Sequence, residues 1–282
     1  MQAIDVHAHP STHVFETTFK PYVDALERYW KESFRVRTEE EMIQEFKDAD
    51  VRVVLVGLDC ETCTGLPKTS NDYIAEMVKK YPDTIAGGFG SVDPWKGDMA
   101  LIEAERAVKE LGLIGFKFHQ ILQKFYPNDR RFYPLWEKLT ELKVVVQFHM
   151  GTTGMGAGMP GGMGEHIKYA APIPYLDDLA ADFPDLTIIG LHPAFPWTDE
   201  MAAVVLHKAN VYWDLSGWAP KYFPSSLIKD IDSRLQDKIL FGSDYPSISH
   251  ARLLREWKAN GHKDAVLEKV FYKNAQRILR LL

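Results

Sequence analysis

Eight short apolar runs recur along this chain of 282 residues, and segments with the apolar spacing of amphipathic helices lie between them. One such segment runs from a predicted N-cap at Asp98 to Leu111 and is followed by Gly112. Strands that alternate with helices pair in parallel through right-handed crossovers. Eight such units predict an α/β fold, a (β/α)8 (TIM) barrel, which typically takes about 250 residues. Because no linker divides the sequence, we expect a single domain over residues 1–282. The predicted strands are Ile4–His7, Val51–Leu58, Ile85–Val92, Leu113–Phe118, Val144–His149, Thr187–Leu191, Val211–Leu215 and Ile239–Phe241.

Titratable side chains stand at the ends of several predicted strands. In a barrel of this kind, the active site is built at the C-terminal ends of the strands. The residues in these positions are His7 and His9, Lys117 and His119, His149, His192, and Asp244. Their shared place on one rim predicts that they form one site.

The first strand, IDVHAH, shows how such a site is supplied with ligands. Side chains alternate between the two faces of a strand. The even positions are apolar and are expected to pack against the outer helices, so Asp5, His7 and His9 are expected to point into the barrel mouth. Imidazole nitrogens and carboxylate oxygens are typical ligands of zinc. Together with His149 and Asp244, His7 and His9 therefore predict a divalent metal site.

These motifs resemble the amidohydrolase superfamily, and within it the branch of aminocarboxymuconate-semialdehyde decarboxylase-like proteins. The resemblance covers essentially the whole chain and rests on IDVHAHP, GFKFH, VVVQFHMG, IIGLHP, and LFGSDYP followed by NAQRILRL. It implies a single zinc, or sometimes manganese, held by His7, His9, His149 and Asp244. It also implies that His192 acts as an acid or base close to the metal.

Lys117 has two interpretations. In binuclear members of the superfamily, a lysine at this place is carboxylated and bridges two metals, and His192 is then a ligand of the second ion. In the branch that this chain resembles, one metal is usual. We therefore favour Lys117 as a cation that faces an anionic substrate or intermediate.

The same residues serve two reactions. Hydrolysis of a small organic substrate, derived from an aromatic or unsaturated acid, is the main expectation: a metal-activated water attacks a carbonyl, Asp244 accepts its proton, and His192 protonates the leaving group. The alternative is non-oxidative decarboxylation of an aromatic or unsaturated carboxylic acid. A metal-binding module without catalysis is disfavoured, because His192 and Lys117 are not needed to complete a four-ligand shell.

Four further residues are candidates for substrate binding. Arg130 and Arg131 follow the fourth strand and could hold a substrate carboxylate bidentately, although a charge pair on the surface at the start of a helix is the favoured interpretation. Trp197 and Trp218 also follow barrel strands. They predict an apolar or aromatic substrate, or they seal the interface of a homodimer.

Two long insertions are expected to cover the site. Residues 10–38 are rich in aromatic side chains, and residues 150–174 are rich in glycine and methionine. The second segment is either a flexible loop or a lid, and we favour the lid because this fold builds its sites from such loops.

Charge and composition limit the partners. A net charge of −6, without basic clusters, argues against nucleic acid, and no apolar run is long enough to span a membrane. The N-terminus does not resemble a secretory signal, so we expect a cytoplasmic, homodimeric enzyme with a small-molecule substrate. Cys60 and Cys63 are too few for a disulfide framework. We expect His207, His250 and His262 to lie on helix surfaces.

Overall fold

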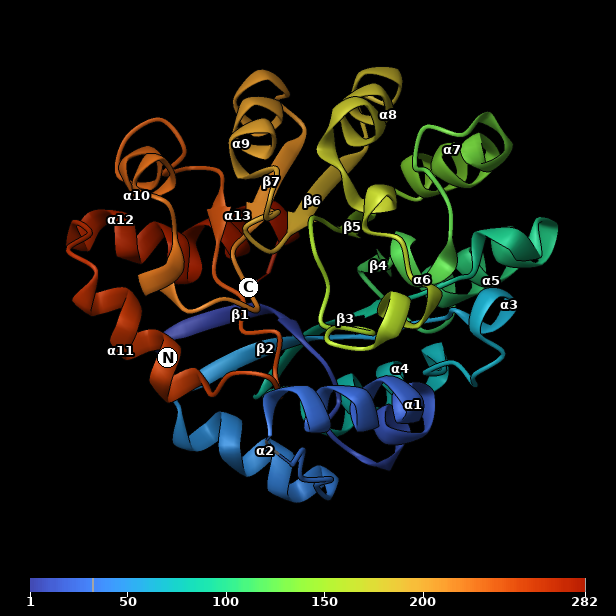
Figure 1. Cartoon of the computed structure of the whole chain (residues 1–282), viewed down its shortest axis with the longest axis horizontal. Coiled ribbons are helices and arrows are strands. Elements are labelled where there is room, and N and C mark those ends of the chain that lie inside the picture. Colours follow the sequence, from blue (N-terminus) through green and yellow to red (C-terminus); the bar gives the residue numbers. More distant parts are fainter. Residues whose placement is uncertain (32, 282) are drawn as a thin grey trace.

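A computed structural model describes residues 1–31 and 33–281. It contains one sheet of eight parallel strands in the order β1 to β8, surrounded by helices (Figure 1). The strands are β1 Ala3–Ala8, β2 Val51–Val56, β3 Ile85–Gly90, β4 Gly115–Phe118, β5 Val145–His149, β6 Thr187–Leu191, β7 Val211–Asp214 and β8 Ile239–Leu240. Each corresponds to one of the predicted apolar runs, so the predicted (β/α)8 barrel is confirmed.

The barrel closes between its last and first strands. The amide of Val6 donates to the carbonyl of Phe241 at 3.0 Å, and the amide of Asp244 donates to the carbonyl of His7 at 2.9 Å. Further along the same two segments, the amide of His9 donates to the carbonyl of Tyr245, also at 2.9 Å. The closure therefore runs through the backbone of three predicted metal ligands.

Helices cover the outside of the barrel and its two ends. They are α1 His13–Trp30, α2 Glu39–Asp48, α3 Glu61–Thr64, α4 Asn71–Lys80, α5 Asp98–Lys109, α6 Gln120–Gln123, α7 Tyr133–Glu141, α8 Asp177–Asp182, α9 Thr198–His207, α10 Ser225–Ile231, α11 His250–Ala259, α12 Asp264–Glu268 and α13 Asn274–Leu279. Helix α5 begins one residue earlier than expected, because Gly97 and not Asp98 is its N-cap. Among the described residues, no helix has both the length and the apolar character needed to cross a membrane.

The core has two layers, separated by the strands. Inside the barrel, one cluster joins residues from opposite strands, and α13 contributes Ala275 and Ile278 to it, so this helix closes the end of the barrel away from the site. Outside the barrel, a larger cluster joins the strands to the surrounding helices. Stability therefore resides in layers that do not depend on the polar residues at the rim.

The prediction for the faces of β1 was wrong in part. Ile4 and Val6 belong to the inner cluster and do not pack against outer helices. The register between β1 and β2 shifts between Asp5 and Ala8, which marks a bulge. A bulge inserts one residue and so breaks the alternation of faces. His7 turns into the site for this reason, whereas Asp5 contacts the outer helix α11.

Candidate active site

Three predicted metal ligands converge at the ends of β1 and β8. The Nε2 atoms of His7 and His9 lie 3.3 Å apart. The carboxylate of Asp244 lies 3.3 Å from Nε2 of His7 and 3.5 Å from Nε2 of His9. His192, directly after β6, belongs to the same centre, because His7, His192 and Asp244 each offer one ligand atom within 4.8 Å of the others.

The position of the Lys117 ammonium group shows that this centre accommodates a cation. Its Nζ contacts Nε2 of His7 and lies 3.1 Å from Nε2 of His9. The two imidazole lone pairs therefore meet a cation at one point, on the side where the Asp244 carboxylate also lies. Nitrogen and carboxylate donors of this kind suit a divalent transition metal. The residues present fit the metal that the sequence predicts.

The backbone at this centre is held in an unusual conformation. His192 has a φ of 66° and Asp244 a φ of 58°, both in the left-handed region. Side chains other than glycine avoid this region at a cost of roughly 1–3 kcal/mol unless their surroundings enforce it. Strain at two residues of one site is typical of groups placed for function.

Burial sets the protonation of the centre. It lowers the pKa of His9 to about 4 and the pKa of Lys117 to about 8. Burial alone would raise the pKa of Asp244, but the neighbouring His7 and the hydrogen bond with His9 hold that pKa well below its usual range. His9 is thus neutral, with its lone pair available, and Asp244 is an anion.

Asp214 orients His7, although it was not among the predicted site residues. Its Oδ2 lies 3.2 Å from Nδ1 of His7, and the hydroxyl of Ser216 lies 2.9 Å from the same nitrogen. A proton held on Nδ1 leaves the Nε2 lone pair for the centre. The signal was present in the sequence, because Asp214 stands one residue before the end of the seventh predicted strand, as Lys117 does in the fourth.

Asp5 connects the segment that carries His7 to the segment that carries Asp244. Its Oδ1 accepts the amide hydrogens of His7 and Ser243, at 2.9 and 3.0 Å, and its Oδ2 lies 2.7 Å from Nε2 of His250. His250 is therefore buried, and the prediction that it lies on a helix surface was wrong. His262 is buried too, against Asp232, whereas His207 is exposed as predicted.

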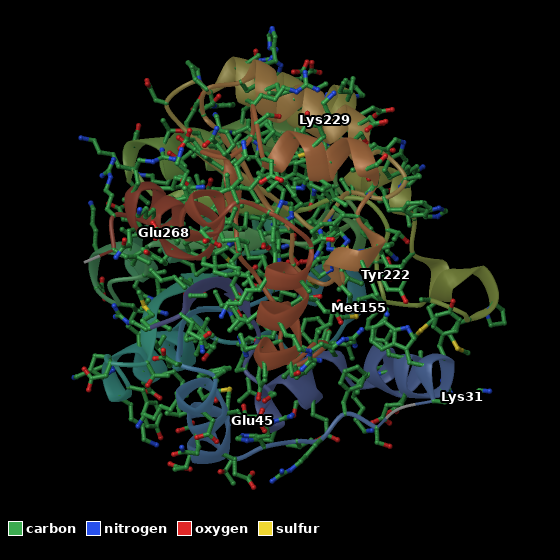
Figure 2. All side chains as sticks on the ribbon, turned by 90° about the vertical axis from the view of Figure 1, so that its left-hand side faces the viewer. Lys31, Glu45, Met155, Tyr222, Lys229 and Glu268 are labelled. Atoms are coloured by element: carbon green, nitrogen blue, oxygen red, sulfur yellow. The ribbon has the colours of Figure 1, made fainter. Side chains whose placement is uncertain are left out.

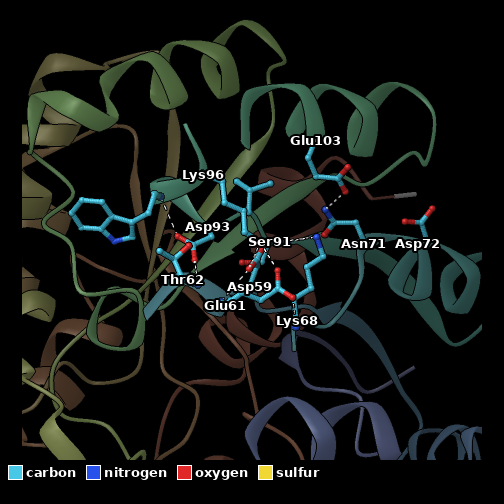
Figure 3. A network of polar contacts seen from close by, with 12 residues as sticks. Asp59, Glu61, Thr62, Lys68, Asn71, Asp72, Ser91, Asp93, Lys96 and Glu103 are labelled. Atoms are coloured by element: carbon cyan, nitrogen blue, oxygen red, sulfur yellow. Dashed lines mark hydrogen bonds and ion pairs between the residues drawn. The ribbon is translucent and has the colours of Figure 1, made fainter. Parts of the chain in front are cut away.

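The backbone of Lys117 is also fixed by buried polar groups. The hydroxyl of Ser91 donates to the carbonyl of Lys117 at 2.8 Å, and the Asn71 side chain accepts from the amide of Ser91 at 2.9 Å. Figure 3 shows Asn71 between Ser91 and Glu103, whose carboxylate accepts from Asn71 at 2.7 Å. The position of β4, which carries Lys117, is therefore fixed by contacts with the residue that follows β3 and with the start of α4.

His149, the fourth predicted ligand, faces another partner. Its Nε2 lies 3.0 Å from the carbonyl of Thr152, and its ring stacks on His119 at a centroid distance of 4.1 Å. Its ring also lies 4.6 Å from that of His192. His149 is therefore next to the centre, and its role as a ligand stays a prediction.

A cavity of about 370 Å³ opens over these residues. Its floor is polar, and its walls are mainly apolar. The floor contains His9, Lys117, His119, His149, His192 and Asp244, and the walls contain Leu26, Tyr29, Trp30, Leu58, Met155 and Trp218. A volume of this size accommodates one small organic molecule.

The two predicted insertions meet over this cavity. The first forms α1, and the second packs against it. Gly154 faces Leu26, and Met155 packs on a small cluster that includes Phe19 of α1. Figure 2 shows Met155 beside α1. The hydroxyl of Tyr22 donates to Glu165 at 2.7 Å and so ties the helix to the loop.

Three of the four predicted substrate-binding residues lie elsewhere. Arg130 and Arg131 are largely exposed, with 78% and 64% of their side-chain surface accessible, and they pair with Asp182 and Asp129. These arginines follow a short helix and a loop, which carry them away from the rim. Trp197 does not line the cavity either, whereas Trp218 does.

Comparison with known proteins identifies the family. The family described as Amidohydrolase matches residues 4–281. The chain belongs to this amidohydrolase family. The predicted superfamily and its decarboxylase-like branch are confirmed, and the chain is an enzyme of that superfamily.

Relatives of this amidohydrolase include decarboxylases. Gamma-resorcylate decarboxylase of Polaromonas sp. is 26% identical over 264 residues, which cover 76% of each chain. An uncharacterised TIM-barrel protein from Bordetella bronchiseptica is 23% identical, with a TM-score of 0.80 over 99% of both chains. A dihydroxybenzoic acid decarboxylase from Polaromonas sp., solved with manganese and the inhibitor 2-nitroresorcinol, is 20% identical, with a TM-score of 0.70 over 99% of this chain and 96% of that one.

Proposed function

We propose that this amidohydrolase is a metal-dependent, non-oxidative decarboxylase of a small aromatic or unsaturated carboxylic acid. One observation carries the proposal: the buried ammonium group of Lys117 lies on the floor of a cavity whose walls are mainly apolar. A carboxylate suits the floor, and an unsaturated or aromatic body suits the walls. The named decarboxylases among the relatives support the same reaction.

The metal would be held by His7, His9 and Asp244, together with His149 or His192. We expect one divalent ion, zinc as first predicted or manganese as in the Polaromonas structure. When bound, it would supply a Lewis acid that holds the substrate oxygens in place. The proposal treats Lys117 as a free amine and not as a carboxylated bridge.

The residues of this chain divide the remaining work. Lys117 pairs with the substrate carboxylate and orients it. His192 donates from Nδ1 to the carbonyl of Ser216 at 3.1 Å, so its Nε2 is the atom that takes up and returns a proton. Nε2 delivers that proton to the carbon that bears the carboxylate. The bond to the carboxylate then breaks, its electron pair restores the unsaturated system, and carbon dioxide leaves.

Hydrolysis, the main expectation from the sequence, is now the weaker alternative. The relatives with named activities reported above are decarboxylases, and the geometry of the centre does not favour water attack over proton delivery. The homodimer and the cytoplasmic location predicted from the sequence stay predictions.

The test is to incubate the metal-loaded enzyme with dihydroxybenzoates, other hydroxybenzoates and unsaturated acids, alongside their methyl esters. We expect carbon dioxide from an acid and no acid from an ester. Acid release from the esters, without carbon dioxide from any acid, would show a hydrolase and overturn the proposal.

A further inference from the structure

Gln147 carries a buried amide group inside the barrel that the proposed reaction does not use. It lies on β5 and has no exposed surface. Its neighbours Val146 and Phe148 pack in the outer core cluster, so the alternation of faces along a strand turns Gln147 to the inside. Gln147 does not line the cavity. Any effect that it has on the chemistry must therefore act through another residue.

This amide group lies next to apolar side chains. Val145, on the same face of β5, and Ile189, in register with Gln147 on β6, belong to the inner core cluster. A polar group is unfavourable in such a place unless it is hydrogen-bonded. The Nε2 atom of Gln147 donates to the carbonyl of Val6 at 2.9 Å, whereas its Oε1 atom is buried without a partner among the described residues. The bond to Val6 is thus the one hydrogen bond of this side chain within the described chain.

That bond crosses the interior of the barrel and reaches the bulge in β1. Eight strands in sequence order, closed between the last and the first, place β5 opposite β1. Between the register pairs Asp5–Val53 and Ala8–Leu55, β1 has two residues where β2 has one. A bulge disrupts the regular pairing of a strand, so the backbone there needs other contacts to restrain it.

The peptide group between Val6 and His7 is held at both of its polar ends. Its carbonyl accepts from Gln147 inside the barrel, and its amide hydrogen, on the nitrogen of His7, is accepted by Oδ1 of Asp5 at 2.9 Å. A peptide group is planar, so hydrogen bonds at its two opposite edges restrain the orientation of the whole plane. That plane ends at the Cα atom of His7, and it therefore influences the direction in which the imidazole leaves the strand.

We propose that Gln147 is a positioning residue, which holds the peptide group between Val6 and His7 through its Nε2–H and so aims the imidazole of His7 at the centre. Metal ligands have to be held within about 0.5 Å of their productive positions, and contacts behind them provide that precision. The inference rests on the proposed metal site but not on decarboxylation, since any reaction at this metal needs His7 in place.

Two substitutions remove the bond in different ways. Methionine is apolar and about as long as glutamine, so Gln147→Met fills the same space without a donor. Asparagine keeps the amide but is shorter by one methylene group, so Gln147→Asn leaves the donor short of the Val6 carbonyl. The control is Gln123→Met, because Gln123 is also fully buried and its Nε2 donates to the carbonyls of Asp59 and Val92, at 2.8 and 3.2 Å. Neither carbonyl adjoins a predicted metal ligand.

The experiment is titration of each metal-free protein with cobalt(II), followed by the visible absorption of the bound ion, together with thermal unfolding of the same proteins. We expect Gln147→Met and Gln147→Asn to weaken cobalt binding about 10- to 100-fold, the usual effect of losing a contact that orients a metal ligand. The absorption spectrum of the bound ion should also change, because it reports the arrangement of the ligands. Gln123→Met should bind cobalt as the unmodified protein does, although its Tm falls.

Other outcomes overturn the inference. Unchanged affinity and an unchanged spectrum in either folded Gln147 variant would show that the bond only satisfies a buried carbonyl. Equal weakening in Gln123→Met would show a general loosening of the barrel. If the unmodified protein binds no cobalt, the metal site itself is wrong and the inference falls with it. Carbon dioxide release is measured separately, so the proposed decarboxylation can fail while this inference stands.

Discussion

Lys117 places an ammonium group where the lone pairs of His7 and His9 meet, and this contact separates its two possible roles. If it is a cation for the substrate, Lys117→Met should keep one metal equivalent per chain. The KM should rise about 10- to 100-fold, because a charge-assisted contact is lost. Elemental analysis and steady-state kinetics measure the two effects.

A matched control is Lys96→Met, since Lys96 lies on the same rim but pairs with Asp59 and Glu61 (Figure 3). This control should leave KM unchanged. A fall from two metal equivalents to one or none in Lys117→Met would instead show a carboxylated, bridging lysine.

His192 lies within reach of the metal ligands, yet its proposed task is to move a proton. We expect His192→Ala to keep its metal and to lose turnover by about 10²- to 10⁴-fold, the range for a positioned acid or base. Metal content and kcat are measured on the same preparation. His207→Ala, at an exposed histidine, is the control, and loss of metal from His192→Ala would make His192 a ligand.

The loop of residues 150–174, which we predict to be a lid, meets α1 at the cavity. Gly158 has a φ of 73°, and a Cβ on it would lie 2.1 Å from the ring of Tyr29. Gly158→Ala should therefore push the loop off α1, raise KM several-fold and increase cleavage of the loop by a protease.

Gly161 provides the comparison for this substitution. It lies in the same loop with a φ of 59°, but a Cβ on it would meet nothing within 4 Å. Gly161→Ala has the same backbone strain without the clash. Equal effects of the two substitutions on KM and proteolysis would show that strain, and not the contact with Tyr29, is responsible.

Helices and strands could be predicted where the sequence has a periodic apolar pattern. Local departures from regular structure could not. Apolar runs located all eight strands, and strand ends located His7, His9, Lys117, His192 and Asp244. The bulge in β1 has no periodic signal, so Asp5 was assigned to the wrong face. Its partner His250 lies 245 residues away, and a pairing at that distance has no local pattern. Arg130 and Arg131 do not line the cavity as expected, because the path of the loop before them cannot be predicted from its composition.

For the whole molecule, the metal should add stability that the empty protein lacks. Binding to the folded state alone, at a metal concentration about 1,000 times the Kd, contributes about 4 kcal/mol. Chelation should lower Tm by on the order of 10 °C for a chain of this size, and one equivalent of zinc or manganese should restore it. Calorimetry with metal analysis checks this. An unchanged Tm after complete removal would mean that the centre is not coupled to folding.

The hydrogen bonds that close the barrel join residues near the two ends of the chain at the centre itself. A ribosome delivers His7 and His9 first and Asp244 more than 200 residues later, because their separation is set by the sequence. Until β8 has emerged and docked, the nascent chain presents two histidines without their carboxylate. The complete set of these predicted metal ligands therefore forms only at the last step of folding, when β8 closes the barrel around its core.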